Sequence, residues 1–175
     1  MNADTKLHDS IKDAREQLNL VLGFFPRVDS KASVVLAINS GMLAVLASNA
    51  PPGASIPVWS IIAASLTLLM IAGSFWFLYK VSFPILSGGQ QSLIYFREIA
   101  NRTEARFIDE FVAQDEKARL RDVLAQVWRN SEILKMKFDA LRWAFVLMAA
   151  SLVPWVVLVF LFSANSATVR SLFVR

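Results

Sequence analysis

Three blocks of the sequence are apolar for long enough to cross a lipid bilayer, and this constrains the fold more than any other feature. The blocks are residues 33–50, 58–78 and 143–162, and none of them contains a charged side chain. A helix needs about 20 mostly apolar residues, at about 1.5 Å each, to cross a hydrocarbon core of about 30 Å. Asn39 and its neighbours interrupt the first block, which leaves a soluble core helix as its alternative. We predict an integral membrane protein with three transmembrane helices.

The polar remainder of the chain predicts helices rather than strands. Apolar residues recur at alternating spacings of four and three in segments 5–25 and 115–145, which is the pattern of an amphipathic helix. No run of alternating apolar and polar residues is long enough for a sheet. The two apolar stripes must be buried, and each other is the simplest partner, with neighbouring subunits the second candidate. We predict an all-α fold with a cytosolic helical bundle beside the three transmembrane helices.

Several residues predict where these helices begin and end. Pro26 either kinks the first helix or opens a new one, because proline is tolerated in a first helical turn. A short helix is expected over 91–100, and Thr103 is the expected N-cap of the next helix. A long helix is expected over 115–162, where Pro154 is the one helix breaker.

The distribution of Lys and Arg predicts the orientation of the spans. These residues are frequent before the first block and between the second and third, whereas segment 49–57 carries no charge. Cytoplasmic loops retain the positive residues, so the N-terminus and the long connector are expected in the cytoplasm. The predicted segments are a cytosolic amphipathic helix at 1–31, transmembrane helices at 32–50, 57–80 and 141–163, a cytosolic helical connector at 81–140 and a short tail at 164–175.

The composition excludes several kinds of chemistry. The chain has no cysteine and one histidine, which excludes thiolate catalysis and the usual protein zinc sites. Its basic residues are interleaved with acidic ones, so a nucleic-acid partner is not expected. Adjacent carboxylates such as Asp109 and Glu110 point apart on a helix and are expected to be solvated. We predict no catalytic residues, no metal site and no enzymatic activity.

Several motifs resemble those of a known family. The stretch RVDSKAS at 27–33 resembles the Asp-x-Lys-Ala-Ser motif before the first span of the transmembrane effectors of Pycsar, the pyrimidine cyclase system for antiphage resistance. The stretches YFREIA at 95–100, FIDEF at 107–111 and KMKFDALRWA at 135–144 are similar to the rest of that family's pattern. The similarity covers nearly the whole chain in order.

The resemblance implies a function. In such systems a partner cyclase makes cyclic CMP (cCMP) or cyclic UMP (cUMP) on infection, and the effector then impairs the inner membrane, so that the infected cell dies before phage are released. It implies the cyclic nucleotide as a partner and no cofactor, while the apolar blocks indicate membrane lipid and a small-residue ridge in the first span suits further copies of the chain. The chain has no room for a β-roll nucleotide-binding domain, so a partner is the alternative receptor. The alternative function is a membrane scaffold or adaptor that recruits a soluble sensor; a transporter is disfavoured by the small number of spans.

The connector offers candidate ligand residues. A cyclic mononucleotide presents one phosphate charge, a ribose hydroxyl and a pyrimidine edge, which suit a cation, an amide and an aromatic plane. The connector residues of these kinds are Tyr95, Arg97, Asn101, Arg102, Arg129 and Asn130. We expect Arg102 or Arg129 to hold the phosphate; a charged solvent face with core aromatics is the alternative.

Two further groups of residues belong to the first span. Arg27, Asp29 and Lys31 lie at its expected cytoplasmic end, where Asp29 and Lys31 do not face each other because they are two residues apart. We expect ion pairs of these residues with other partners to fix the entry of the helix into the membrane or to bridge it to the connector, and ordinary flanking charge is the alternative. Small residues inside the span form a ridge, with two polar residues at mid-depth, which suits either close helix packing or a pore lining. The ridge is Ala37, Gly41, Ala44 and Ser48, and the polar residues are Asn39 and Ser40.

Overall fold

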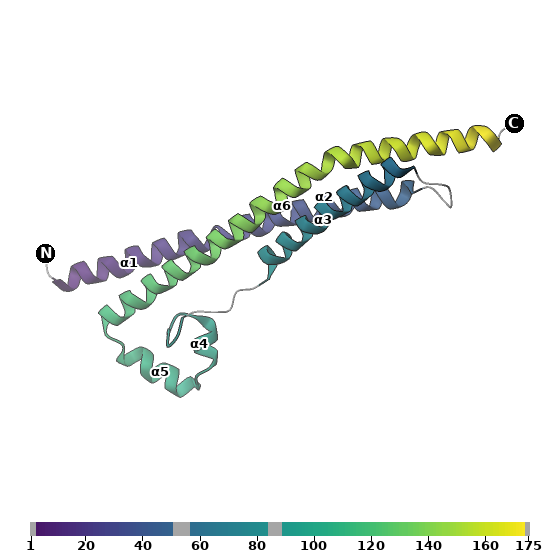
Figure 1. The fold of residues 1–175 in the computed structure, drawn as a ribbon. Helices are drawn as coiled ribbons and strands as arrows, with labels where there is room; N and C mark the ends of the chain where they lie inside the picture. Colours follow the sequence, from purple (N-terminus) through teal and green to yellow (C-terminus); the bar gives the residue numbers. More distant parts are fainter. Residues whose placement is uncertain (1–2, 51–56, 84–88, 174–175) are drawn as a thin grey trace. The chain divides into compact units, whose positions relative to one another are not determined.

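The computed structural model describes residues 3–50, 57–83 and 89–173, and every regular element in these ranges is an α-helix. In chain order the helices are α1 (Ala3–Leu22), α2 (Phe25–Asn49), α3 (Val58–Ser82), α4 (Phe96–Ala100), α5 (Glu104–Ala113) and α6 (Glu116–Phe173) (Figure 1). Three helical stretches are long and apolar enough to cross a membrane: Thr5–Asn49, Val58–Ser82 and Glu116–Ser163. The all-α fold and the three candidate spans are therefore confirmed. The middle of the uncharged segment, residues 51–56, lies outside the described ranges.

The chain divides into two compact units. One, which we call the connector unit, comprises Met1–Arg27 and Phe83–Lys137, and the other, the span unit, comprises Val28–Ser82 and Phe138–Arg175. Helices α2 and α6 contribute residues to both.

Two predicted helix starts are confirmed. Helix α1 ends at Leu22, and α2 begins at Phe25 with Pro26 in its first turn. Proline has no backbone N–H, but an N–H in the first turn has no hydrogen-bond acceptor within the helix. Thr103 is the N-cap of α5, and its hydroxyl accepts a hydrogen bond from the backbone N–H of Arg106 at 3.4 Å. Pro26 and Thr103 therefore set these helix starts through local backbone geometry, which can be predicted from the sequence.

The helix predicted over 91–100 is wrong in its first half. Gln91 has a φ of 62°, in the left-handed region that a right-handed helix excludes, and Tyr95 has an extended backbone, so helix α4 begins only at Phe96. At the other end of the chain, α6 continues beyond the predicted 162 to Phe173.

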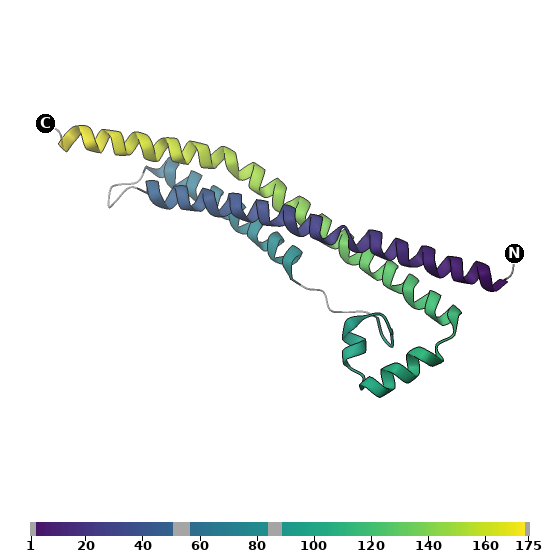
Figure 2. The same ribbon diagram turned by 180° about the vertical axis from the view of Figure 1, so that it is seen from behind.

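The span unit packs three helices along heptad-like seams. Helices α2 and α3 and the second half of α6 lie side by side in both opposite views (Figures 1 and 2). The buried positions on α2 alternate in steps of four and three, as in a coiled coil: Val28, Ala32, Val35, Asn39, Met42 and Leu46. Those on α3 follow a similar rhythm but include three hydroxyl residues: Ser60, Ala63, Thr67, Ile71, Ser74, Leu78 and Val81. The seam is thus made of small and polar residues as much as of large apolar ones.

A relay of hydrogen bonds joins the three helices at the middle of this seam. The Asn39 amide Nδ2 donates to Ser74 Oγ at 2.8 Å, and the Ser74 hydroxyl donates to the carbonyl oxygen of Ala144 at 2.8 Å. All three residues are fully buried. Near the far end of α2, Trp155 Nε1 donates to the carbonyl of Met42 at 3.0 Å. Interhelical hydrogen bonds of this type act together with close packing to hold helices together within lipid.

An aromatic cluster marks the other end of the span unit. The rings of Trp76 and Tyr79 stack with centroids 6.0 Å apart, and Phe77 stacks on Trp143 at 6.4 Å. The Lys80 ammonium lies 5.5 Å from the centre of the Trp76 ring. Tryptophan and tyrosine with a nearby cation are typical of the level of lipid headgroups.

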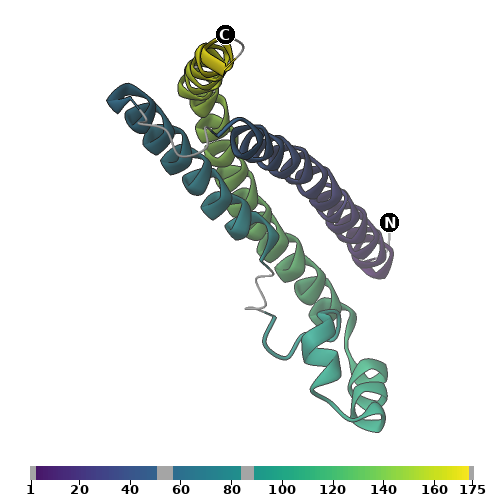
Figure 3. The same cartoon turned by 90° about the vertical axis from the view of Figure 1, so that its right-hand side faces the viewer.

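The connector unit combines α1 with the first part of α6 and the two short helices. Helix α1 buries the apolar stripe that the spacing predicted, at Ile11, Ala14 and Val21. The first part of α6 buries Val123 and Gln126. Helices α4 and α5 fold back beside the start of α6 (Figures 1 and 3).

Candidate functional site

Hydrogen bonds to the side chain of Ser92 fix the conformation of the loop before α4. The Ser92 hydroxyl oxygen accepts hydrogen bonds from the backbone N–H groups of Ile94 at 3.1 Å and Tyr95 at 3.0 Å. It also accepts one from the Gln126 side-chain amide at 3.2 Å, which ties the loop to α6. Gly89 opens the loop with a φ of 73°, a conformation that glycine adopts without strain.

Arg102 holds this loop against α5. Its Nε donates to Glu110 Oε2 at 2.8 Å, and its Nη2 donates to the carbonyl of Gln91 at 2.9 Å. Its Nη1 donates to the carbonyls of Ser92 at 3.1 Å and Glu98 at 2.6 Å. The side chain is only 8% exposed. Four of the five donor hydrogens of a guanidinium are thereby engaged by the protein itself.

Glu110 receives a second arginine. Arg106 Nε donates to Glu110 Oε1 at 2.7 Å, so each carboxylate oxygen has its own guanidinium. The hydrogen bonds from Arg106 and Arg102 lower the pKa of Glu110 below its ordinary value, and the bond to Glu110 raises that of Arg106. Glu110 therefore remains ionised over the physiological pH range.

A polar pocket of about 500 Å³ opens beside this arginine pair. It is enclosed by the loop, by α5 and by the start of α6, and it lies wholly within the connector unit. Its lining residues are Gln90, Gln91, Ser92, Leu93, Arg102, Arg106, Glu110, Gln114, Ala118, Arg121, Asp122 and Ala125. Its size falls within the range of small-molecule sites, about 300–1,000 Å³.

Arg121 is the available cation of the pocket. It is exposed, and within the described ranges no carboxylate lies within 4 Å of its guanidinium. The other acid of the pocket, Asp122, instead accepts the backbone N–H of Leu93 at 2.8 Å. A negatively charged ligand would therefore meet an unpaired charge at Arg121 and, at Arg106, an exposed charge that is paired with Glu110.

The six ligand residues predicted from sequence fall into two groups. Arg102 lines the pocket, where it is held as described. Tyr95 is half-buried and its ring packs edge-on to Phe96 at 5.0 Å, while Arg97 and Asn101 are exposed on and after α4. On α6, Arg129 pairs with Glu132 at 2.9 Å and the Asn130 amide donates to the carbonyl of Gln126. Apart from Arg102, none of the six is among the residues that line the pocket.

Sequence analysis missed the residues that build this site. Ser92, Gln126 and Asp122 carry no motif, and the Arg102–Glu110 pair spans eight residues rather than a helical three or four. The one available signal was the polar run Gly-Gly-Gln-Gln-Ser at 88–92, which is typical of a turn.

The residues predicted at the start of the first span are exposed. The Arg27 guanidinium lies 5.1 Å from the centre of the Phe24 ring. The Asp29 carbonyl accepts a hydrogen bond from the Ser33 hydroxyl at 3.0 Å. Lys31 lies on the span unit, and its ammonium has no carboxylate within 4 Å among the residues described there.

The predicted span residues separate on two faces of α2. Asn39 points into the three-helix seam, and its Oδ1 is a buried acceptor without a hydrogen-bond donor in the part of the chain that the structure describes. Ala37, Ser40 and Gly41 lie on the open face, where Ser40 bonds only to its own helix at Leu36. The small-residue ridge is thus not the seam of this chain.

No cluster of three metal-ligating side chains occurs among the described residues. A comparison with protein families matches residues 13–164 to PycTM, the Pycsar effector protein domain. No curated protein and no solved structure matches the chain. The family match covers far more than half of the 175 residues and includes α2 to α5 complete. The chain therefore belongs to the PycTM family of Pycsar effectors, membrane proteins of antiphage defence.

Proposed function

We propose that the chain is activated by a cyclic pyrimidine nucleotide, cCMP or cUMP, and then impairs the inner membrane, so that an infected cell dies before phage are released. The family match over residues 13–164 is the observation that carries this proposal, because a Pycsar effector responds to the product of a partner cyclase. The three apolar helices supply the part that acts in the bilayer. The chain needs no catalysis of its own for this function.

The orientation in this proposal follows the distribution of charge. Lys and Arg are concentrated in the connector unit, and segment 49–57 carries no charge. The N-terminus and the connector unit therefore face the cytoplasm, where the nucleotide is made. Self-association through the open ridge of α2 is the proposed way in which several copies form a lesion.

The polar pocket is the proposed receptor for the nucleotide. Arg121 and Arg106 offer charge-assisted hydrogen bonds to the single phosphate, since Arg102 is occupied by the loop. The side-chain amides of Gln90, Gln91 and Gln114 can both donate and accept, as a pyrimidine edge and a ribose hydroxyl require. A pocket that joins a loop to two helices is also one whose shape a ligand can change.

The function is tested by the membrane potential of cells that express the chain. We expect depolarisation within minutes of a pulse of cCMP or cUMP and none after a pulse of cyclic AMP. An unchanged potential with both pyrimidine nucleotides would contradict the function and favour a membrane scaffold that recruits a separate sensor.

The receptor is tested by calorimetry on the full chain in detergent with cCMP and cUMP. Arg121→Ala should weaken binding about 10- to 100-fold, the effect of losing a hydrogen bond to a charged group. Arg119→Ala is the matched control, because Arg119 lies two residues away on α6 and packs over the Phe111 ring instead. Loss of binding in Arg129→Ala with normal binding in Arg121→Ala would contradict the polar pocket as the receptor and place the binding site near Arg129 on α6.

A further inference from the structure

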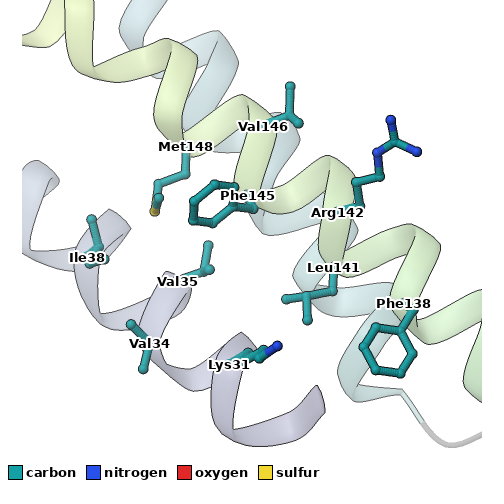
Figure 4. A pocket seen from close by; sticks show the side chains of 10 residues that line it. All are labelled: Lys31, Val34, Val35, Ile38, Phe138, Leu141, Arg142, Phe145, Val146 and Met148. Atoms are coloured by element: carbon teal, nitrogen blue, oxygen red, sulfur yellow. The ribbon is translucent and has the colours of Figure 1, made fainter. Parts of the chain in front are cut away.

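A second, apolar groove lies in the span unit between α2 and α6. It has a volume of about 480 Å³, and its walls are almost entirely hydrocarbon (Figure 4). The lining residues are Lys31, Val34, Val35, Ile38, Phe138, Leu141, Arg142, Phe145, Val146 and Met148. Val34 and Phe145 are more than half exposed, so the groove is open along one side.

The groove has a charged end and an apolar end. Helices α2 and α6 run in the same direction here, so Lys31 lies at the level of Phe138 and Leu141, whereas Ile38 lies at the level of Met148 (Figure 4). The residue after Arg142 is Trp143, which belongs to the aromatic cluster typical of the headgroup level. The charged end is therefore at the membrane surface, and the apolar end reaches into the hydrocarbon.

Lys31 is the cation of the groove. Its side chain points toward α6 beneath Leu141, while the Arg142 guanidinium points away from α2 and adds positive charge at the same depth (Figure 4). Neither residue forms an ion pair within the described ranges. A long aliphatic stem with a charged tip suits a position where hydrocarbon meets headgroups.

We propose that this groove binds one anionic phospholipid, with an acyl chain along Val34, Ile38 and Phe145 and the phosphate on Lys31. Basic pockets between transmembrane helices are a recurrent form of site for anionic headgroups. The charge distribution favours a lipid over a second copy of the chain, because another copy would bring a further Lys31 to a mouth that is already positive. This inference concerns the span unit alone and does not depend on nucleotide activation.

Native mass spectrometry of the detergent-purified full chain tests the headgroup contact. We expect the chain to retain phosphatidylglycerol in preference to phosphatidylcholine when both are added in equal amounts. Lys31→Ala should reduce this preference about fivefold, and Lys31→Arg should restore it. Lys80→Ala, which removes a cation from the aromatic cluster outside the groove, should leave the preference unchanged. No preference in the unmodified chain, or equal losses in Lys31→Ala and Lys80→Ala, would overturn the proposal.

A second pair of variants tests the acyl chain. Val34→Trp fills the groove from an exposed position and should lower the retention of both lipids at least severalfold. Val45→Trp, on the same helix but outside the groove, is the matched control and should retain both. Normal lipid retention in Val34→Trp would exclude the groove as the site. A dimer that dissociates in Val34→Trp but not in Val45→Trp would instead identify a second copy as the occupant.

Discussion

The connector unit and the span unit use polar side chains in different ways. In the connector unit, Arg102 reaches two loop carbonyls, one carbonyl of α4 and a carboxylate, so one charged group closes a loop of the chain. In the span unit, the polar contact between helices is uncharged, and Asn39 and Ser74 join three separate helices. Water can hydrate an opened loop, but lipid cannot hydrate a separated amide. A hydrogen bond broken in the first unit can therefore be replaced by one to water, whereas one broken between the helices of the second cannot.

The largest effect on stability is expected from removing Arg102, which holds the loop before α4. Arg102→Ala should destabilise the connector unit by about 2–4 kcal/mol, because the change leaves Glu110 and three carbonyls without their buried donor. Hydrogen exchange at residues 89–102 should accelerate, while exchange in α3 stays unchanged. Arg106→Ala removes the other, exposed partner of Glu110 and should leave exchange in the loop nearly as it was. Equal acceleration in both variants would show that burial is not what makes Arg102 important.

The next largest effect on stability is expected from replacing Gly89, which opens the loop before α4. Gly89→Ala should cost about 1–2 kcal/mol, because its φ of 73° disfavours any side chain and the new Cβ would lie 2.9 Å from the Tyr95 ring. Gly41→Ala in the span unit is the control, since an added Cβ there has no atom of this chain within 4 Å. Thermal unfolding of the two variants in detergent measures the difference. A stable Gly89→Ala protein would mean that the loop has a second conformation of similar energy.

The interhelical relay should give a smaller effect. Ser74→Ala removes the link between Asn39 and the Ala144 carbonyl and should destabilise the span unit by about 1 kcal/mol. Ser40→Ala, which loses only a bond within α2, should change stability by a few tenths at most. Reversible unfolding in mixed micelles compares the two. Equal stabilities would indicate that apolar packing alone holds the three helices together.

The smallest effect on stability is expected from lowering the pH until Glu110 is protonated. The pKa of Glu110 in the folded chain lies below its ordinary value of 4.5, so its contribution to stability is complete above about pH 4.5 and is lost as the pH falls through the lowered pKa. The difference in melting temperature between the unmodified chain and Glu110→Gln should therefore shrink between pH 6 and pH 3.5. A difference that stays constant over this interval would show that the ionised form is not what stabilises the loop.

Much of the fold could be predicted from sequence because its signals are local. Pro26, Thr103 and the lengths of the apolar blocks each act within one helix or at its end. The packed face of α2 could not be found in the same way. Every face of a span is apolar, so hydrophobicity does not distinguish the seam at Val35 and Asn39 from the open ridge at Ala37 and Gly41.

The polar pocket was harder to predict for a related reason. Arg102 looked like a ligand residue because its charge is visible in the sequence, but its partners lie four to eleven residues away around a turn. The turn itself depends on Gln91 in the left-handed region, which few residues other than glycine adopt. Charge alone therefore does not reveal that Arg102 holds the loop, and its role as a phosphate ligand stays a prediction.

Pro154 within α6 has a consequence for the motion of the last span. A proline has no N–H to donate, so the carbonyl oxygen of Ala150, one turn earlier, has no partner from the helical ladder. Bending at this point breaks no backbone hydrogen bond, whereas bending one turn away in either direction would break one. Any bend of the last apolar helix should therefore be centred on Ala150 and Pro154.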